Sequence, residues 1–181
     1  PASAPHALSF KQIEDMADKL AQRLKADPKD PQGWAMLARS YTMLGRRAEA
    51  VTAYERAVAL QGQDASLLAD YADALAVTRE SRLAGEPAAL VERALKLDPD
   101  HAKALSLAGT AAFERKDYAG AVARWEHLLE VAPPDSPFVG PMRANIAQAR
   151  ELGGLAGTAA AASTAGSGRG SRIGITQPAG Q

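Results

Sequence analysis

The same spacing of large and small side chains recurs along residues 31–133, about every 34 residues. In the first occurrence, four of these side chains lie on one face of a predicted helix: Trp34, Leu37, Ala38 and Tyr41. After a turn at residues 44–46, a second helical set follows: Ala50, Tyr54 and Ala57. One unit therefore predicts two antiparallel helices, which cannot bury their apolar faces alone and must stack on neighbouring units.

The next two units keep this pattern, with one change in spacing. Leu68 stands 34 residues after Trp34. Val91 stands 37 residues after Tyr54, so the second unit has three extra residues in its connection, at residues 79–86. The third unit returns to the original register with Leu105, Ala108, Gly109, Ala112, Ala121, Trp125 and Pro133.

These positions match the signature of the tetratricopeptide repeat (TPR). In that signature, W-x2-L-G-x2-Y on the first helix is followed by A-x3-F and a closing proline on the second. Three such repeats predict an all-α, right-handed TPR superhelix. Trp34 and Trp125 occupy signature positions, so we interpret both as core residues rather than as platforms for a ligand. No segment alternates between polar and apolar residues with a period of two, so no strand is expected.

Capping residues and prolines predict where the helices begin and end. A capping side chain followed by proline should begin a helix at Asp30-Pro31 and Ser136-Pro137. The residue before a proline is driven out of the helical conformation, which should end helices at Asp27-Pro28 and Asp98-Pro99. The second helix of the second unit is predicted to begin at Pro87.

The repeats and their flanks define the domain organisation. Helices at about residues 8–26 and 137–152 are expected to cover the two open ends of the stack. Residues 1–7 form an N-terminal extension, residues 8–152 the TPR domain, and residues 153–181 a flexible tail rich in glycine, alanine and serine. The tail has almost no large apolar side chains, so it cannot bury enough surface to offset its ordering entropy.

Composition and charge argue against several classes of function. The 21 basic and 21 acidic side chains balance, which is unlike the basic surface of a nucleic-acid-binding protein. The absence of cysteine excludes a redox pair and a thiolate metal site. No run reaches the 18 or so apolar residues of a membrane span, so membrane attachment would need segments that this chain does not contain.

Residue patterns typical of catalysis are also missing. The three histidines, His6, His101 and His127, lie on different predicted elements and lack the i, i+4 spacing of a helical metal site. His101 is interpreted as part of a turn that enters a helix. Serine occurs without a nucleophile elbow, and no glycine-rich phosphate loop is present. We therefore expect no enzymatic activity, no cofactor and no metal.

The informative surface is the groove that the first helix of each repeat lines in a TPR stack. Residues expected to face it recur about one helical turn apart and are not needed by the signature itself. They are Met36, Arg39, Met43, Asp70, Asp73, Val77, Leu107, Thr110 and Phe113. Met36, Met43, Leu107 and Phe113 are expected to form an exposed apolar strip, with Arg39 on one side and the two aspartates on the other. Such a strip suits an amphipathic helix, although a merely solvated surface is the alternative interpretation.

Three stretches also resemble a known family. They are DPQGWAMLARSY at 30–41, LLADYADAL at 67–75 and KALSLAGTAAF at 103–113. Together with the lengthened second repeat around Gly85-Glu86-Pro87, they are similar to the periplasmic TPR domain of the cytochrome c biogenesis factor CcmI. In some bacteria that domain is the C-terminal part of a fused CcmH. The resemblance covers residues 13–152.

This resemblance implies a chaperone in the periplasm. Members of the family bind the C-terminal helix of unfolded apocytochrome c and present it to the components of the haem-ligation complex. Longer members carry two N-terminal membrane spans and a further domain after the repeats. The alternative is a TPR adaptor of another assembly, such as a complex that inserts haem into nitrite reductase.

Overall fold

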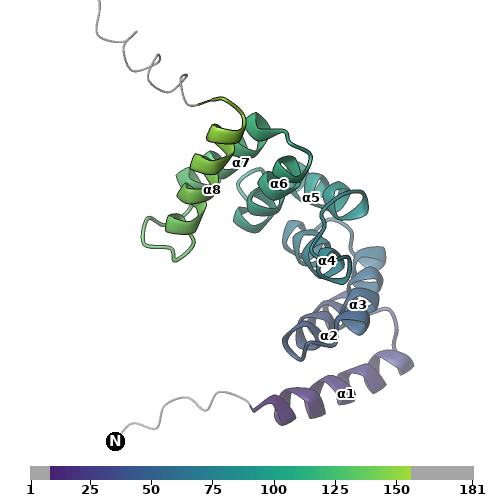
Figure 1. Cartoon of the computed structure of the whole chain (residues 1–181). Coiled ribbons are helices and arrows are strands. Elements are labelled where there is room, and N and C mark those ends of the chain that lie inside the picture. Colours follow the sequence, from purple (N-terminus) through teal and green to yellow (C-terminus); the bar gives the residue numbers. More distant parts are fainter. Residues whose placement is uncertain (1–8, 156–181) are drawn as a thin grey trace, which may run out of the picture.

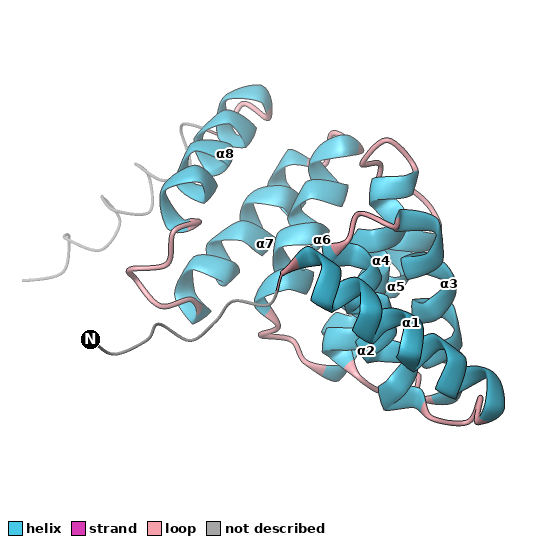
Figure 2. Ribbon diagram, turned by 90° about the horizontal axis from the view of Figure 1, so that it is seen from below, coloured by secondary structure: helices cyan, strands magenta, loops and turns pink. Residues whose placement is uncertain are grey.

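Eight α-helices follow one another between residues 9 and 155, the part of the chain that this computed structural model describes (Figure 1). Their bounds are α1 Phe10–Ala26, α2 Pro31–Met43, α3 Arg47–Leu60, α4 Ala65–Thr78, α5 Glu86–Leu97, α6 Ala102–Glu114, α7 Tyr118–Val131 and α8 Val139–Leu152. No strand occurs within those residues, and Figure 2 shows only helices and loops there. The predicted extension, residues 1–7, and the tail beyond residue 155 lie outside the described residues.

The helices pack as three consecutive pairs, α2 with α3, α4 with α5, and α6 with α7. Each pair corresponds to one predicted repeat, so the expected all-α TPR architecture is confirmed. The pairs follow an arc in which α2, α4 and α6 lie toward the inner side and α3 and α5 toward the outer side (Figure 1). α1 packs on α2 and α8 on α7, at opposite ends of the arc. None of the helices between residues 9 and 155 is long and apolar enough to cross a membrane.

Side-chain caps fix the start of four helices of the repeats. Asp30, Asp64 and Asp117 each accept a hydrogen bond from the backbone N–H three residues later, at 2.8, 2.9 and 2.9 Å. His101 caps α6 in the same way through Nδ1, 3.2 Å from the N–H of Ala104, as expected for a helix-entry residue. Each cap satisfies a backbone donor that has no partner within the helix. The predicted ends at Asp27 and Asp98 are also confirmed.

The start of α8 differs from the prediction. Ser136-Pro137 does not begin a helix, because the N–H of Val139 donates to the carbonyl of Ser136 at 3.1 Å and closes a turn first. Phe138 then takes the N-cap position without a side-chain cap. Smaller differences are that α1 begins at Phe10 rather than residue 8, and that α5 begins at Glu86, one residue before Pro87.

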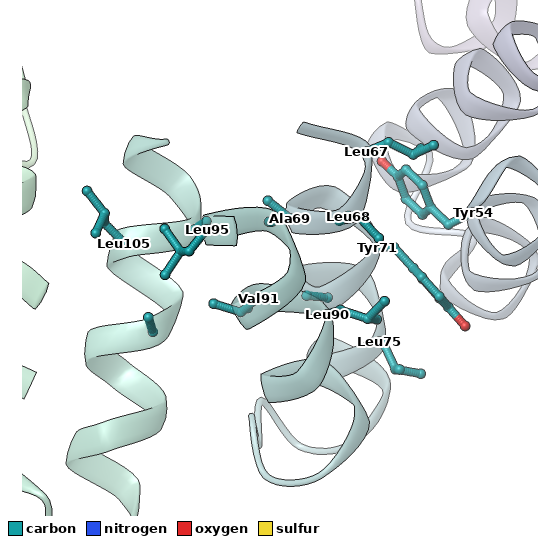
Figure 3. Packing of buried hydrophobic residues seen from close by; sticks show 14 of the residues in the cluster. Tyr54, Leu67, Leu68, Ala69, Tyr71, Leu75, Leu90, Val91, Leu95 and Leu105 are labelled. Carbon is teal, nitrogen blue, oxygen red and sulfur yellow. The ribbon is translucent and has the colours of Figure 1, made fainter. Parts of the chain in front are cut away.

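Alanine and aromatic side chains share the core. Alanines at the repeat positions are almost fully buried and let the helices approach closely, for example Ala38, Ala57, Ala72, Ala94 and Ala121. Between α3 and α4, the rings of Tyr54 and Tyr71 stack with centroids 6.3 Å apart (Figure 3). Leucine and valine side chains of α5 continue the core from there toward Leu105 of α6 (Figure 3).

The two tryptophans differ in burial. Trp125 is 3% exposed and lies directly over Gly109, where an added Cβ would be 2.2 Å from its Nε1. Its Nε1 donates to the carbonyl of Ser106 at 3.3 Å. Trp34 packs against the core but is only half-buried, and its Nε1 donates to the carbonyl of Pro28 at 2.9 Å. The prediction of a core role is therefore confirmed in full for Trp125 and in part for Trp34.

The lengthened connection between α4 and α5 packs against α6. Leu83, near its middle, is 2% exposed and contacts Ala76 of α4 and Ala111 of α6. The N–H of Leu83 donates to the Glu114 carboxylate at the end of α6, at 3.0 Å. The three extra residues therefore join the second repeat to the third.

Candidate partner-binding groove

All nine predicted groove residues lie on α2, α4 and α6, the helices toward the inner side of the arc (Figure 1). A cavity of about 260 Å³ opens there between the first two repeats and reaches α6. Three of the nine residues line it: Asp70, Asp73 and Val77. Thr42, Tyr54, Arg47 and Lys103 complete much of its wall.

Charged side chains of three inner helices form one network beside this cavity. Arg39 Nε of α2 is 3.1 Å from Asp70 Oδ2 of α4. Lys103 Nζ of α6 is 2.9 Å from Asp70 Oδ1 and 2.9 Å from Asp73 Oδ2. Burial lowers the pKa of Lys103, but its hydrogen bonds to Asp73 and Asp70 outweigh that effect, so the pKa lies above its ordinary value.

This network differs from the predicted arrangement of charges. The sequence suggested that Arg39 and the two aspartates would stand on opposite sides of an apolar strip. In the structure Arg39 and Asp70 contact each other directly, because residues about one repeat apart lie side by side on adjacent inner helices. Their charges are therefore compensated within the protein. Arg47, which lines the same cavity, makes no ion pair within residues 9–155.

The exposed apolar strip is narrower than predicted. Met36, Met43 and Val77 are 61%, 63% and 37% exposed. Leu107 and Phe113 are instead half-buried and pack against the core. The ring centroid of Phe113 lies 5.4 Å from that of Tyr118 and 5.9 Å from that of Trp125, because α7 packs closely beside α6. The expectation that Leu107 and Phe113 form an exposed part of the strip is therefore wrong.

Hydroxyl groups on the inner helices use their donors locally. Thr110 Oγ1 donates to the carbonyl of Ser106 at 3.0 Å, and Thr42 Oγ1 to that of Ala38 at 2.9 Å. Ser40 Oγ does the same with the carbonyl of Met36 at 3.0 Å. Such bonds to the preceding turn leave the oxygens of Thr110 and Ser40 as acceptors toward a partner, whereas Thr42 also hydrogen-bonds the side chain of Tyr54.

Lys103 and Arg47 are the site residues that the sequence analysis missed. Lys103 follows Asp70 by 33 residues, nearly one repeat, which was the available signal that the two lie on adjacent helices. Arg47 belongs to the first turn of α3, an outer helix, so the rule that inner helices line the groove does not predict it.

The two histidines within residues 9–155 make structural contacts. His101, the cap of α6, is 3.0 Å from the hydroxyl of Ser66 through Nε2. His127 Nε2 lies 2.8 Å from Asp100 Oδ1. No group of three or more possible metal-ligating side chains occurs within residues 9–155. His6 lies outside the described residues.

Stacked helix pairs with a charged and apolar inner face define a TPR scaffold, a class of protein that binds other polypeptides. The chain belongs to the family of the cytochrome c-type biogenesis protein H TPR domain, which matches residues 2–139. CycH of Pseudomonas aeruginosa is 37% identical over 150 residues, which cover 83% of this chain and 36% of the relative. CcmH of Escherichia coli K12 is 29% identical over 147 residues, which cover 80% of this chain and 41% of that relative. The chain thus spans between a third and a half of the length of these two relatives.

A further relative belongs to a different assembly. NrfG, a subunit of the formate-dependent nitrite reductase complex of Escherichia coli O157:H7, is 27% identical over 121 residues. That alignment covers 67% of this chain and 61% of NrfG. The family model and its relatives carry the names CycH and CcmH, so membership of that family is shown and the more specific name CcmI is not confirmed.

Solved structures agree with the fold. MamA superposes with a TM-score of 0.69 at 19% identity, over 80% of this chain and 81% of MamA. PilW, a type IV pilus biogenesis factor, superposes with a TM-score of 0.61 at 20% identity, over 80% of this chain and 64% of PilW. At these identities the likeness concerns the fold alone.

Proposed function

We propose that this domain binds the C-terminal helix of apocytochrome c in the periplasm and presents it to the haem-ligation machinery. The observation that carries this proposal is membership of a family of cytochrome c-type biogenesis proteins. The TPR scaffold supports a role as an interaction adaptor rather than as a catalyst. The CcmI-like chaperone role, including the choice of the apocytochrome helix, is the finer part of the proposal.

The groove supports binding of one amphipathic helix. Met43 and Val77 offer exposed apolar side chains on consecutive repeats, and the cavity of about 260 Å³ beside Val77 can receive an apolar side chain of the ligand. Each anchor buried in this way contributes about 1.5–3 kcal/mol. Ordering an unfolded ligand costs roughly 2–5 kcal/mol. Three or four anchors therefore give affinity in the micromolar range or somewhat tighter.

Charge gives the bound helix a direction. Arg39, Asp70, Asp73 and Lys103 compensate one another, so they present little net charge to a ligand. Arg47 is the cation at the cavity wall that has no partner of its own among the described residues. An acidic residue of the helix, placed one or two turns from its apolar anchor, would meet this side chain.

A titration of the domain with the C-terminal peptide of a c-type apocytochrome tests the proposal. Met43→Lys and Val77→Lys should each weaken binding about tenfold or more, because a charge replaces an apolar contact. Leu60→Lys is a matched control, since Leu60 is 45% exposed at the end of the outer helix α3. Phe113→Ala is less suitable than these variants because Phe113 packs on Trp125.

Folded holocytochrome provides the second comparison. Its terminal helix is already packed away, so it should compete poorly with the peptide. Equal binding of folded and unfolded cytochrome, or the same affinity for all three lysine variants as for the parent, would contradict the chaperone role.

A role in a nitrite reductase complex is the second candidate, favoured by the similarity to NrfG. A TPR adaptor of that assembly would bind a peptide from a nitrite reductase cytochrome. Titrations with this peptide and with the apocytochrome c peptide under one set of conditions separate the two functions. The tighter ligand identifies the assembly.

A further inference from the structure

The first inner helix is exposed where the later inner helices are covered. Met36, Asp70 and Leu107 are equivalent residues, each two positions after the signature residue that begins its repeat. Leu107 is half-buried beside Ala76 of α4 and Leu83, because α4 precedes α6 along the inner side. Met36 is 61% exposed. No inner helix precedes α2 within residues 9–155.

α1 does not occupy the position of an inner helix before α2. It packs on α2 as α3 packs on α4 and α5 on α6, so it has the position of an outer helix. Between α1 and α2 there remains a cavity of about 340 Å³, which we call the end site. Its apolar wall is formed by Met16, Leu20 and Met36. Met16 is 57% exposed, so two methionine side chains stand open to solvent in one site.

The opposite end of the arc is closed in a different way. α8 buries Met142, Ile146 and Ala149 against α7. Apart from Leu152 at its last position, which is 54% exposed, the side chains that α8 leaves exposed are mostly polar or small, such as Arg143, Gln148 and Glu151. A polar outer face is the normal property of a terminal helix in a repeat protein. The apolar end site is therefore a departure from capping at one end, and exposed apolar patches of this kind mark interaction surfaces.

Two cations border the end site. Lys19 and Arg23 of α1 line it, and the only acid that pairs with either among the described residues is Asp30, 3.0 Å from Arg23. Lys19 has no ion pair in that part of the chain. Residues 1–8 and 156–181 contain no acid, so these segments of the chain do not complement the border. Charge complementarity thus favours a partner with acidic residues.

We propose that the end site binds an amphipathic helix of a partner protein that carries acidic residues along one edge. The helix takes the place of one more inner helix, with its apolar face on Met16, Leu20 and Met36 and its acidic edge beside Lys19. The site lies outside the cavity proposed for the apocytochrome helix. It assigns Met36, predicted as a groove residue, to a second binding surface.

The four methionines of the chain allow the two surfaces to be told apart. Met16 and Met36 belong to the end site, Met43 is exposed on the groove side, and Met142 is buried under α8. The domain is labelled with ¹³C at the methionine methyl groups and titrated with a synthetic helix of about 15 residues. This probe has leucines at i, i+3, i+4 and i+7 and glutamates along one edge. The methyl signals of Met16 and Met36 should shift, while those of Met43 and Met142 stay.

Variants with matched controls test the contacts. Met36→Lys should weaken binding of the probe about tenfold, and Met43→Lys, of nearly equal exposure, should leave it unchanged. Lys19→Glu should weaken binding severalfold in low salt, because exposed charges act through screened Coulomb interactions. Lys11→Glu is the control for this variant, because it makes the same change of charge on α1 away from the end site and should leave binding unchanged. A probe with lysines in place of the glutamates should prefer the Lys19→Glu variant.

Three results would overturn the proposal. The first is a shift of Met43 without a shift of Met16 and Met36, which would support the groove alone. The second is equal affinity for the glutamate and lysine probes. The third is a shift of Met16 and Met36 with protein concentration in the absence of probe, which would show that a second copy of the chain covers the site. Loss of apocytochrome binding with intact shifts of Met16 and Met36 would contradict only the proposed function.

Discussion

The contact between Gly109 and Trp125 sets how closely α6 and α7 approach. Replacing Gly109 by Ala should destabilise the fold by about 1–3 kcal/mol, because the new methyl group meets a rigid indole ring. This cost exceeds the roughly 0.5–1 kcal/mol that alanine gains over glycine in a helix. Urea denaturation measures the difference in free energy of unfolding.

Gly140→Ala is the control for this substitution. Gly140 lies in the first turn of α8, and nothing stands within 4 Å of the position of its added Cβ. This variant should be as stable as the parent or slightly more stable. If Gly109→Ala gains stability to the same extent, the close approach of the two helices is not as described.

Tyr54 predicts how stability depends on pH in the alkaline range. Burial raises the pKa of Tyr54, and the nearby charge of Asp70 raises it further, whereas Thr42, Arg39 and Lys103 lower it. Above about pH 10, the ordinary pKa of tyrosine, the unfolded chain loses this proton before the folded chain does. The free energy of unfolding therefore falls as pH rises from there through the folded-state pKa.

Tyr54→Phe should reduce this alkaline loss of stability. The measurement is urea denaturation of parent and variant between pH 8 and about pH 11. The difference in free energy of unfolding between parent and variant at pH 8 measures how removal of the hydroxyl affects packing. Any further difference that develops at higher pH reports the ionisation of Tyr54. Parallel curves across the whole range would exclude Tyr54 as a source of the effect.

At the scale of elements, the connection between α4 and α5 acts as part of the core. Leu83→Ala should cost about 2 kcal/mol or more, as expected for a buried leucine, and should loosen the contact of α4 with α6. Arg82→Ala is the matched control, because its side chain is 75% exposed and, among residues 9–155, forms an ion pair only with Glu80. Similar melting of both variants would mean that the connection does not stabilise the stack.

Helices with strong local signals could be predicted from the sequence. The repeat spacing placed the three helix pairs, and Asp30-Pro31 and Asp98-Pro99 marked boundaries that the structure confirms. Ser136-Pro137 misled because a serine and a proline also suit the turn that precedes α8. The position of the lengthened α4–α5 connection was predicted to within one residue, but burial of Leu83 depends on Ala111 of another repeat, which no local signal reveals.

Side-chain exposure in the groove was predicted less well than the helices. Met43 and Val77 are exposed on the inner helices as expected. Phe113 occupies an equally suitable helix position, but its burial depends on Trp125, which becomes a neighbour only when α7 folds back. The ion pairs of Lys103 likewise depend on the angle between adjacent repeats.

At the scale of the whole molecule, helices should differ in local stability according to their place in the row. α4 packs on α3, α5 and α6, whereas α1 packs mainly on α2 and α8 mainly on α7. Stability in a repeat protein is carried by contacts between neighbours, so the ends open first. Hydrogen exchange should be fastest in α1 and α8 and slowest in α4 and α5. Uniform exchange would show that the solenoid opens only as one unit.

The charge network of Arg39, Asp70, Asp73 and Lys103 has a mechanical consequence. It crosses both junctions between repeats on the inner side of the arc, so any motion that straightens the solenoid must stretch its ion pairs. The concave edge of the solenoid therefore resists extension more than the convex edge does. Dissolved salt weakens such half-exposed pairs and makes the solenoid more compliant. The width offered to a ligand is then a property of the ionic medium as well as of the sequence.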